Sequence, residues 1–206
     1  MISSSALDRE IVLQDQALVV MPFLNATMAH RASQQLAKRA GCAGLLLAVH
    51  DDHQEGFVKL INRAFALSQS AVFGYTAQDA FAGRDWLAIA SRALANEKAG
   101  LAAFNDGKWA GQMAAFGLAD PQWVKSVYGG PLFFPEYHSH YADTELSVIA
   151  RSQMKYCYDP NAILVEVDWD KDSKIVNNED RSLFNNRKNN SFYIPKIRKN
   201  IFHLFE

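Results

Sequence analysis

The sequence has little of several features that would mark a particular class of protein. Its two cysteines, Cys42 and Cys157, lie far apart and form no metal-ligand pair, which favours a reducing compartment. No apolar run reaches the roughly 18 residues that a membrane-spanning helix needs. The stretch Met1–Leu18 carries acidic and basic residues through its middle, so we expect no signal peptide.

Excess charge, repeats and glycine-rich loops are also absent from the sequence. The formal net charge is -1, so the chain lacks the basic excess of a nucleic-acid-binding protein and we expect no nucleic-acid partner. We find no internal repeat and no glycine-rich phosphate loop. What the chain does have is apolar content, since 49% of its 206 residues are hydrophobic. That content predicts one globular domain with a sizeable core and a small appendage.

Short apolar runs alternate with amphipathic segments in the first half of the chain. Continuous apolar runs predict strands buried on both faces, at Ala17–Met21, Gly44–Val49 and Ala71–Tyr75. Helical spacing of apolar residues predicts helices between them, over Met28–Arg39 and Phe57–Leu67. We expect Pro22 to end the first strand and Asn25 to cap the first helix. This order predicts an α/β fold with a single Rossmann-like, mainly parallel sheet flanked by helices.

The second half of the chain is less regular. The pattern predicts helices over Trp86–Lys98 and Ala142–Gln153, and strands over Leu101–Phe104 and Ala162–Val167. Lys108–Val127 has weak periodicity, so we expect a loop with short helical pieces. We divide the chain into a main domain, residues 1–170, and a basic, Asn-rich appendage, residues 171–206. Within the appendage, Ile194–Phe205 interleaves basic and apolar residues and predicts an amphipathic helix, either packed on its own domain or docked on a membrane surface or an acidic partner.

Acidic residues gather where predicted strands end or a predicted helix begins. The four clusters are Asp51 with Asp52, Asp79, Asp143 with Glu145, and Glu166 with Asp168 and Asp170. Because the carboxyl ends of parallel strands share one edge, we expect the clusters to converge on one crevice. Carboxylates are the ligands that Mg²⁺ and Mn²⁺ prefer, and a lone carboxylate with a raised pKa can serve as a general base. Each acid taken alone could also cap a turn or sit on the surface.

Three donor-side motifs follow one another in a definite order. A hydrophobic strand runs into Pro22 and, three residues on, Asn25; two acids end the next strand; and Asn62 lies on the following helix. In order and spacing these motifs resemble those of the family 2 glycosyltransferases of the GT-A fold, nearest the rhamnosyltransferase-like members. The resemblance covers about residues 17–169. It implies a GT-A-type sheet and a nucleotide-sugar donor whose nucleotide is bound by Pro22, Asn25, Asp51, Asp52 and Asn62.

The same resemblance implies a divalent metal ion. The clip Ala77-Gln78-Asp79 resembles the family's metal motif, usually written Asp-x-Asp, with Ala77 in place of the first acid. Val165–Trp169 resembles a strand end where many members carry a metal-binding histidine, and here Asp168 would take that place. The implied cofactor is therefore Mg²⁺ or Mn²⁺, held by Asp79 and Asp168. Two histidine pairs, His50 with His53 and His138 with His140, could also bind a metal, although such pairs in loops are more often surface residues.

The acceptor side of the resemblance points to a general base. Tyr141–Leu146 resembles the motif Glu-Asp-x-x-Leu, in which the aspartate is the base, with Ala142 in place of the glutamate. The implied reaction is an inverting transfer of a sugar to an acceptor hydroxyl, on a glycan or a lipid-linked molecule, as in polysaccharide biosynthesis. Asp143 would be the base and Glu145 the reserve candidate. The expected location is cytoplasmic, or at the inner face of the membrane through the C-terminal tail.

Two other functions remain open at this point. Ala77, Ala142 and the missing histidine each remove a usual polar group, so the chain could be an inactive nucleotide-sugar-binding relative or an interaction module. Donor binding that depends on metal but gives no turnover would favour that alternative. A nucleotidyltransferase on a related sheet would normally need a glycine-rich, basic phosphate loop near the first strand, and Pro22–His30 offers none.

Overall fold

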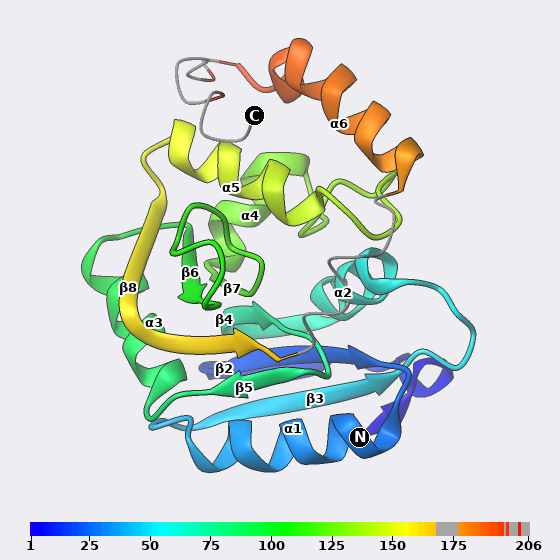
Figure 1. Ribbon diagram of the computed structural model, residues 1–206, viewed down its shortest axis with the longest axis vertical. Helices are drawn as coiled ribbons and strands as arrows, with labels where there is room; N and C mark the ends of the chain where they lie inside the picture. The colour runs from blue at the N-terminus through cyan, green and yellow to red at the C-terminus, as the bar shows by residue number, and fades with distance from the viewer. Residues whose placement is uncertain (168–176, 196, 198–201, 203–206) are drawn as a thin grey trace.

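The computed structural model describes residues 1–167, 177–195, 197 and 202. The strands are β1 (Ile2–Ser3), β2 (Ile11–Phe23), β3 (Gly44–His50), β4 (Ser68–Tyr75), β5 (Ala80–Ala82), β6 (Leu101–Asn105), β7 (Gly117–Ala119) and β8 (Tyr156–Glu166). The α-helices are α1 (Ala26–Lys38), α2 (Phe57–Ala66), α3 (Trp86–Asn96), α4 (Pro121–Tyr128), α5 (Ala142–Ser152) and α6 (Asn178–Asn189), with short 3₁₀ turns at Ser4–Ala6 and Ser191–Tyr193. The described strands form one mixed sheet in the order β1-β3-β2-β4-β7-β6-β8-β5 (Figure 1).

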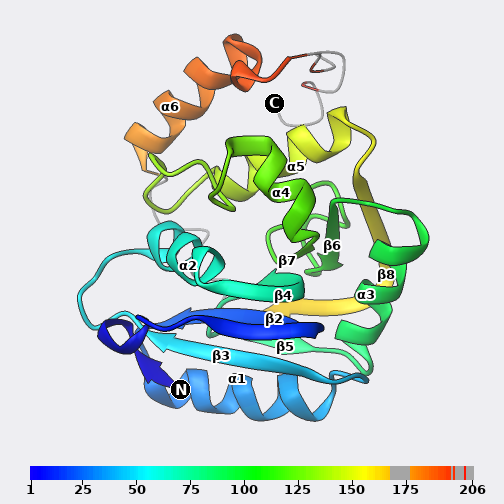
Figure 2. The same cartoon turned by 180° about the vertical axis from the view of Figure 1, so that it is seen from behind.

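The parallel half of the sheet is the half that the sequence predicts best. β2 lies between β3 and β4 and is parallel to both. Its alternating side chains enter two separate cores: Leu18 and Val20 pack with α2, whereas Val19 and Met21 pack with α1. Figures 1 and 2 show α1 and α2 on opposite faces of these strands. Burial on both faces explains why the run is continuously apolar, and the predicted α/β fold with a mainly parallel sheet is confirmed.

β2 is longer than predicted at both ends. It begins at Ile11, and it continues through Pro22, which was expected to end it. Pro22 pairs with Val49 of β3, but β4 has already ended opposite Val20. Proline lacks a backbone N–H, and it is tolerated here because only one neighbouring strand remains at this position.

The segment that was expected to be a loop with short helical pieces, residues 108–127, contains a strand that was not expected and the start of one helix of eight residues. β7 is antiparallel to β4 and β6 and closes the gap between them. At three residues it is too short to show any periodicity. α4 begins at Pro121, and the Asp120 carboxylate caps it by accepting the backbone N–H groups of Gln122 and Trp123. These are ordinary start signals for a helix, so α4 could have been predicted.

The C-terminal part of the described chain packs on the main domain. In Figures 1 and 2, α6 lies over α5, at the end of the molecule opposite α1. Phe184 and Phe192 belong to the same core as α2, α4 and α5. The predicted boundary at residue 170 and most of the predicted tail helix, 194–205, lie outside the described residues. Within the described part of the chain, no helix is long and apolar enough to cross a membrane.

Candidate functional site

The two acids that end β3 are held by the chain itself. The Asp51 side chain accepts the backbone N–H groups of Glu55 at 2.7 Å and Gly56 at 2.9 Å, which shapes the loop into α2. Asp52 accepts the hydroxyls of Ser3 and Ser4, and these bonds hold the pKa of Asp52 well below its usual range. Both predicted nucleotide-binding acids are therefore strongly hydrogen bonded, and Asp52 keeps its charge.

The turn after β2 is joined to the clip after β4. Asn25 caps α1 as expected, because its side chain accepts the Met28 N–H at 3.1 Å. The side-chain amide oxygen of Gln78 (Oε1) accepts the backbone N–H groups of Leu24 at 2.9 Å and Asn25 at 2.8 Å. The structure thus brings the Pro22–Asn25 turn beside the clip that carries Asp79. Gln78 stands inside the motif read from the sequence, but its bridging role could not be read there.

Asn62 connects the donor-side half of the molecule to the other half. Its side chain donates to the Phe133 carbonyl at 3.0 Å and accepts the Phe133 N–H at 2.8 Å. This pair of bonds ties α2 to the aromatic segment that precedes α5. The Asn62 side chain therefore links α2 to the segment around Phe133 and is not a simple surface amide.

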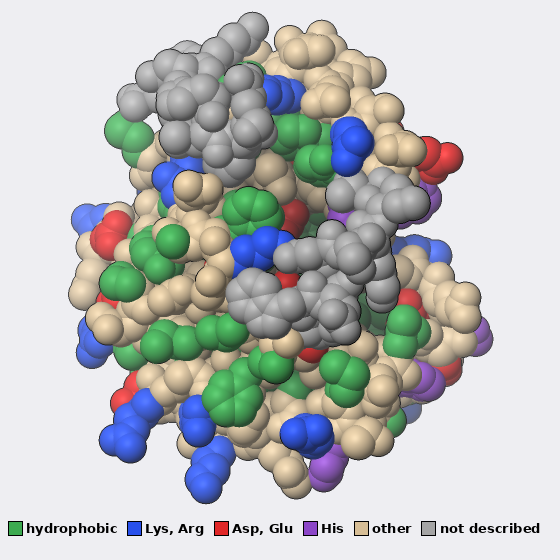
Figure 3. All heavy atoms as spheres, in the orientation of Figure 1, with side chains coloured by type: hydrophobic (Ala, Val, Ile, Leu, Met, Phe, Trp, Pro, Cys, Tyr) green, Lys and Arg blue, Asp and Glu red, His purple; other side chains and the backbone are tan. Residues whose placement is uncertain are grey.

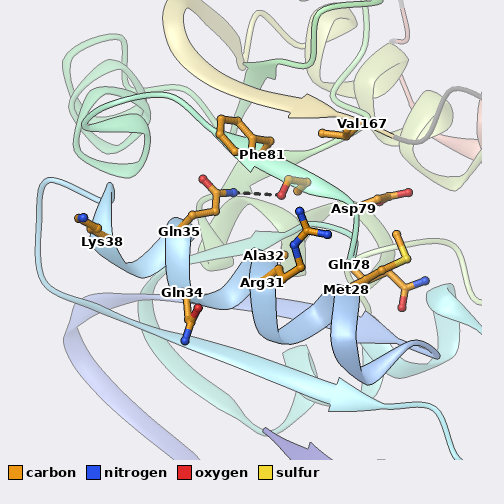
Figure 4. A pocket seen from close by; sticks show the side chains of 11 residues that line it. Met28, Arg31, Ala32, Gln34, Gln35, Lys38, Gln78, Asp79, Phe81 and Val167 are labelled. Atoms are coloured by element: carbon orange, nitrogen blue, oxygen red, sulfur yellow. Dashed lines mark hydrogen bonds between the residues drawn. The ribbon is translucent and has the colours of Figure 1, made fainter.

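A hollow of about 710 Å³ opens between α1 and the clip after β4. Figure 4 shows Arg31 rising from α1 towards the clip that carries Asp79. Asp79 is only 5% exposed. The Gln35 side chain links α1 to β5 beside the hollow, since it donates to the Ala80 carbonyl at 3.1 Å and accepts the Ala82 N–H at 3.0 Å. The hollow combines cationic, amide and carboxylate groups at the carboxyl edge of the sheet.

The described residues fit a metal ion only in part. They contain no group of three or more histidine, cysteine or acidic side chains that could hold one. Asp79 offers one carboxylate, and Asp168 lies outside the described residues. Mg²⁺ is usually bound through one or two carboxylates together with substrate phosphates. This donor set therefore fits a cation that binds together with a diphosphate better than one bound by the protein alone.

Three of the four histidines in the two possible metal-binding pairs make contacts with other parts of the chain. The ring of His50 stacks on Phe23 with 5.1 Å between centroids. The backbone N–H groups of His138 and His140 both donate to Asp180. His138 and His140 thus belong to a loop whose backbone is held by Asp180 of α6.

Asp143 lies in the first turn of α5 and is half-buried. Burial raises the pKa of Asp143 from 3.8 to about 6, although the Thr144 N–H, which donates to it at 2.7 Å, acts in the opposite direction. The negative charge of Asp106 adds to the increase. A carboxylate in this pKa range is charged at neutral pH and still has appreciable proton affinity, as a general base requires.

Asp106 is a candidate that the sequence analysis missed. It directly follows β6 and is 3% exposed. One carboxylate oxygen accepts the backbone N–H groups of Lys108 and Trp109, at 2.9 and 2.8 Å. The other oxygen is buried and has no hydrogen-bond partner among the described residues. The signal that singled out Asp79, an acid just after a predicted strand, applies equally to Asp106, although the sequence analysis did not select it.

Glu145 is fully buried and fully hydrogen bonded. It accepts the hydroxyls of Tyr128 at 2.9 Å and Tyr137 at 2.8 Å. Arg187 of α6 adds two bonds, at 2.7 and 2.8 Å. These four bonds hold the carboxylate in the packing between α5 and α6. They argue against Glu145 as the reserve candidate for the general base. No pattern in the sequence indicates Arg187, which lies in the Asn-rich segment.

Comparisons with known proteins concern the fold. No family model and no curated protein matches the chain. The chain is similar to the structure of the mannosyltransferase PcManGT from Pyrobaculum calidifontis in complex with GDP-Man and Mn²⁺, with 14% identity, a TM-score of 0.63, and coverage of 98% of this chain and 74% of that one. It is also similar to the 1–349 fragment of S. aureus TarS in complex with UDP-GlcNAc, with 11% identity, a TM-score of 0.60, and coverage of 78% and 61%.

A third similar structure is a mutant Drosophila β-1,4-galactosyltransferase 7 in complex with manganese, UDP-Gal and xylobiose. It has 12% identity and a TM-score of 0.58, with coverage of 81% of this chain and 79% of that one. At these identities the similarities show the fold alone, and that fold is of the GT-A glycosyltransferase type. The chain spans less than two thirds of the TarS fragment.

Proposed function

We propose that this protein is a glycosyltransferase that moves a sugar from a nucleotide-diphosphate sugar to an acceptor hydroxyl, with inversion at the anomeric carbon. The observation that carries the proposal is Asp143, a half-buried carboxylate with a pKa raised to about 6 on a GT-A-type fold. The three similar structures were determined with GDP-Man, UDP-GlcNAc and UDP-Gal, which supports the donor class.

In the proposed reaction Asp143 removes the proton from the acceptor hydroxyl. The hydroxyl oxygen then forms a bond to the anomeric carbon while the bond from that carbon to the diphosphate breaks, and a nucleoside diphosphate leaves. Asp143 then releases the proton to water. The nearby charge of Asp106 favours proton uptake by Asp143.

We place the nucleotide over the ends of β2 and β3. Asp51 and Asp52 would accept hydrogen bonds from the base or ribose with the lone pairs that the chain does not use. Pro22 and Asn25 would shape the turn beneath it, and Asn62 would keep that edge in register with the acceptor-side segment. Among the family 2 glycosyltransferases, the rhamnosyltransferase-like members are the ones that the order and spacing of the motifs resemble most.

A Mg²⁺ or Mn²⁺ ion would be held by Asp79, together with Asp168 and the donor diphosphate. When bound, such an ion offsets the negative charge that develops on the leaving diphosphate. The Mn²⁺ in the PcManGT structure and the manganese in the galactosyltransferase 7 structure support this choice of cofactor. For the acceptor we propose a glycan or a lipid-linked saccharide, with peripheral membrane contact through the basic tail.

Calorimetric titration with UDP, GDP and dTDP, with and without Mn²⁺, tests the donor site. We expect one nucleotide to bind, more tightly with Mn²⁺, and Asp79→Asn to remove the effect of the metal. Release of nucleoside diphosphate from the matching nucleotide sugar then tests transfer. Binding without release, over a broad set of acceptors, would instead favour an inactive binding relative, which Ala77 and Ala142 make the second candidate. No binding of any nucleotide would contradict both.

A further inference from the structure

The C-terminal end of α6 is bonded to the first turn of α5 through Arg187. The guanidinium is 6% exposed and bonds both oxygens of Glu145, with Nη2 to Oε1 at 2.7 Å and Nε to Oε2 at 2.8 Å. It also lies over the ring of Phe134, 3.2 Å from the centroid. A bidentate pair of this kind fixes orientation as well as distance. Glu145 stands two residues after Asp143, so Arg187 holds the turn that carries the proposed base.

The other end of α6 holds the loop that leads into α5. The Asp180 carboxylate is 1% exposed and accepts the backbone N–H groups of His138, Ser139 and His140, at 2.9, 3.0 and 2.8 Å. Burial opposes its charge, but these three donors keep the pKa of Asp180 below its usual value. Asp180 therefore holds the backbone of residues 138–140, the loop that leads into the first turn of α5, where Asp143 lies.

Between these two anchors lies a strained residue. Tyr141 is in the left-handed region, with φ of 66°, immediately before α5 begins. Its ring stacks on Phe184 of α6, with 5.0 Å between centroids, and its hydroxyl lies 3.3 Å from Arg181 Nε. A non-glycine residue keeps such a conformation only where its surroundings over-determine it, and here those surroundings are side chains of α6.

Asp143 itself makes none of its hydrogen bonds to α6. Its carboxylate bonds Thr144, and the charged or titratable groups that act on it or feel its charge are Asp106, after β6, and Tyr75, at the end of β4. The influence of α6 on Asp143 must therefore pass through the loop before it and through the glutamate after it. Figures 1 and 2 show α6 lying along this part of the molecule in both views.

We propose that α6 sets the position of Asp143, with Arg187 and Asp180 as positioning residues that act through Glu145 and through the loop 138–140. The part of this proposal that concerns turnover rests on the proposed function. Its physical basis is that transfer requires the base within hydrogen-bonding reach of the acceptor hydroxyl, and a misplacement of about 1 Å can cost roughly 100-fold in rate.

The main test uses the double variant Glu145→Gln/Arg187→Met. The glutamine oxygen can accept one tyrosine hydroxyl and its NH2 group can donate to the other, so the link between α5 and α6 is removed without leaving a buried charge. We expect kcat to fall about 10- to 100-fold. The KM for the donor should stay within about twofold, because the donor lies at the ends of β2 and β3, away from α6. Arg187→Lys, which keeps the charge but cannot form the bidentate pair, should fall between the double variant and the wild type.

Arg39→Met is the matched control. The Arg39 guanidinium also lies over a phenylalanine ring, 4.9 Å from the centroid of Phe81, and it also donates to the chain, at 2.7 Å to the Ala82 carbonyl. Arg39 is the C-cap of α1, which lies far from α5 in Figures 1 and 2. Arg39→Met removes a similar stacking contact and hydrogen bond, and we expect it to leave kcat unchanged.

Two readouts do not require turnover. Carboxyl ¹³C NMR should place the pKa of Asp143 near 6 in the wild type and nearer its ordinary value in the double variant, because water then reaches the carboxylate. Hydrogen exchange should become faster at residues 138–145 and stay slow in β2 and β4. If the double variant does not fold, Asp180→Asn, which removes one anionic acceptor from the loop, provides the same comparison.

Each outcome decides the proposal. An unchanged pKa of Asp143 with unchanged exchange would overturn it, and so would faster exchange with unchanged kcat in an active enzyme. If the wild type transfers no sugar from any donor, the proposed function fails. The NMR and exchange results then still decide whether α6 controls the setting of Asp143.

Discussion

Asp52 on the donor side and Asp143 on the acceptor side are both candidate site residues, but their surroundings move their pKa values in opposite directions. Two serine hydroxyls stabilise the charged form of Asp52 and lower its pKa. Burial destabilises the charged form of Asp143 and raises its pKa to about 6. The first setting suits a fixed charge and the second suits proton transfer. An acid near a strand end or a helix start therefore has no defined role until its donors and its burial are known.

A second contrast lies within α5 itself. Asp143 and Glu145 are two residues apart, yet Glu145 is fully buried and paired with Arg187, while Asp143 forms no ion pair within the part of the chain that the structure describes. The deeper acid is therefore the one with a cationic partner in direct contact. Substitution of Arg187, Asp143 or Asp106 alters the surroundings or the charge of an acid in these contrasts, and substitution of Asn25 alters the donor side. The expected effects decrease from Arg187 through Asp143 and Asn25 to Asp106.

The largest effect on stability should come from breaking the pair on one side only. Arg187→Met leaves the charge of Glu145 buried without a cation, so we expect the free energy of unfolding to fall by about 3–5 kcal/mol. Denaturant unfolding monitored by tryptophan fluorescence measures it. Adding Glu145→Gln should recover most of the loss. A single variant as stable as the wild type would show that the pair does not matter for folding.

Asp143→Asn should stabilise the folded protein at neutral pH. The pKa of Asp143 is higher in the folded state, so the unfolded chain loses its proton first, and stability decreases as pH rises from about 4 to about 6. A difference of about two pKa units corresponds to at most about 3 kcal/mol, and partial solvent access reduces it. Thermal unfolding of both proteins at pH 7 and pH 4 tests this. Equal melting temperatures at pH 7 would contradict the raised pKa.

Asn25→Ala should cost about 1 kcal/mol of stability, the usual loss when an N-cap side chain is removed. Asn25→Asp keeps an acceptor for the Met28 N–H and should remain near the wild type. Nucleotide titration of both variants sharpens the donor-side assignment. If Asn25 acts only as a cap, Asn25→Ala will lose stability and keep its nucleotide affinity. A loss of affinity in both variants would place Asn25 in contact with the nucleotide.

Asp106→Asn should have the smallest effect. It removes a negative charge that raises the pKa of Asp143, so the acid limb of the pH profile of kcat/KM should move to lower pH. A profile from pH 4.5 to 8 would show the movement. Movement to higher pH, or a large loss of rate at every pH, would assign Asp106 a direct part in the reaction.

The sequence predicts the parallel half of the fold because the signals there are local. The apolar runs of β2, β3 and β4 and the spacing in α1 and α2 each lie within one element. β7 could not be predicted, because its three residues become a strand only through hydrogen bonds to β4 and β6. The extension of β2 through Pro22 was missed for a similar reason, since it depends on where the neighbouring strand ends.

The candidate site divides in the same way. Asp143 could be found by its motif, but its raised pKa comes from burial, which the sequence does not show. The bond between Glu145 and Arg187 joins residues 42 positions apart, and nothing in the Asn-rich segment predicts it. Asp106 follows a predicted strand and could have been proposed by the rule that selected Asp79.

The central claim is that Asp143 is the base of a sugar transfer, and one preparation of Asp143→Asn tests it most directly. Donor binding by calorimetry and transfer in a single turnover should be measured on the same sample. We predict donor affinity equal to that of the wild type and a rate of transfer lower by about 10²- to 10⁴-fold, the usual contribution of a general base. Wild-type rates in Asp143→Asn, with donor binding intact, would contradict the account.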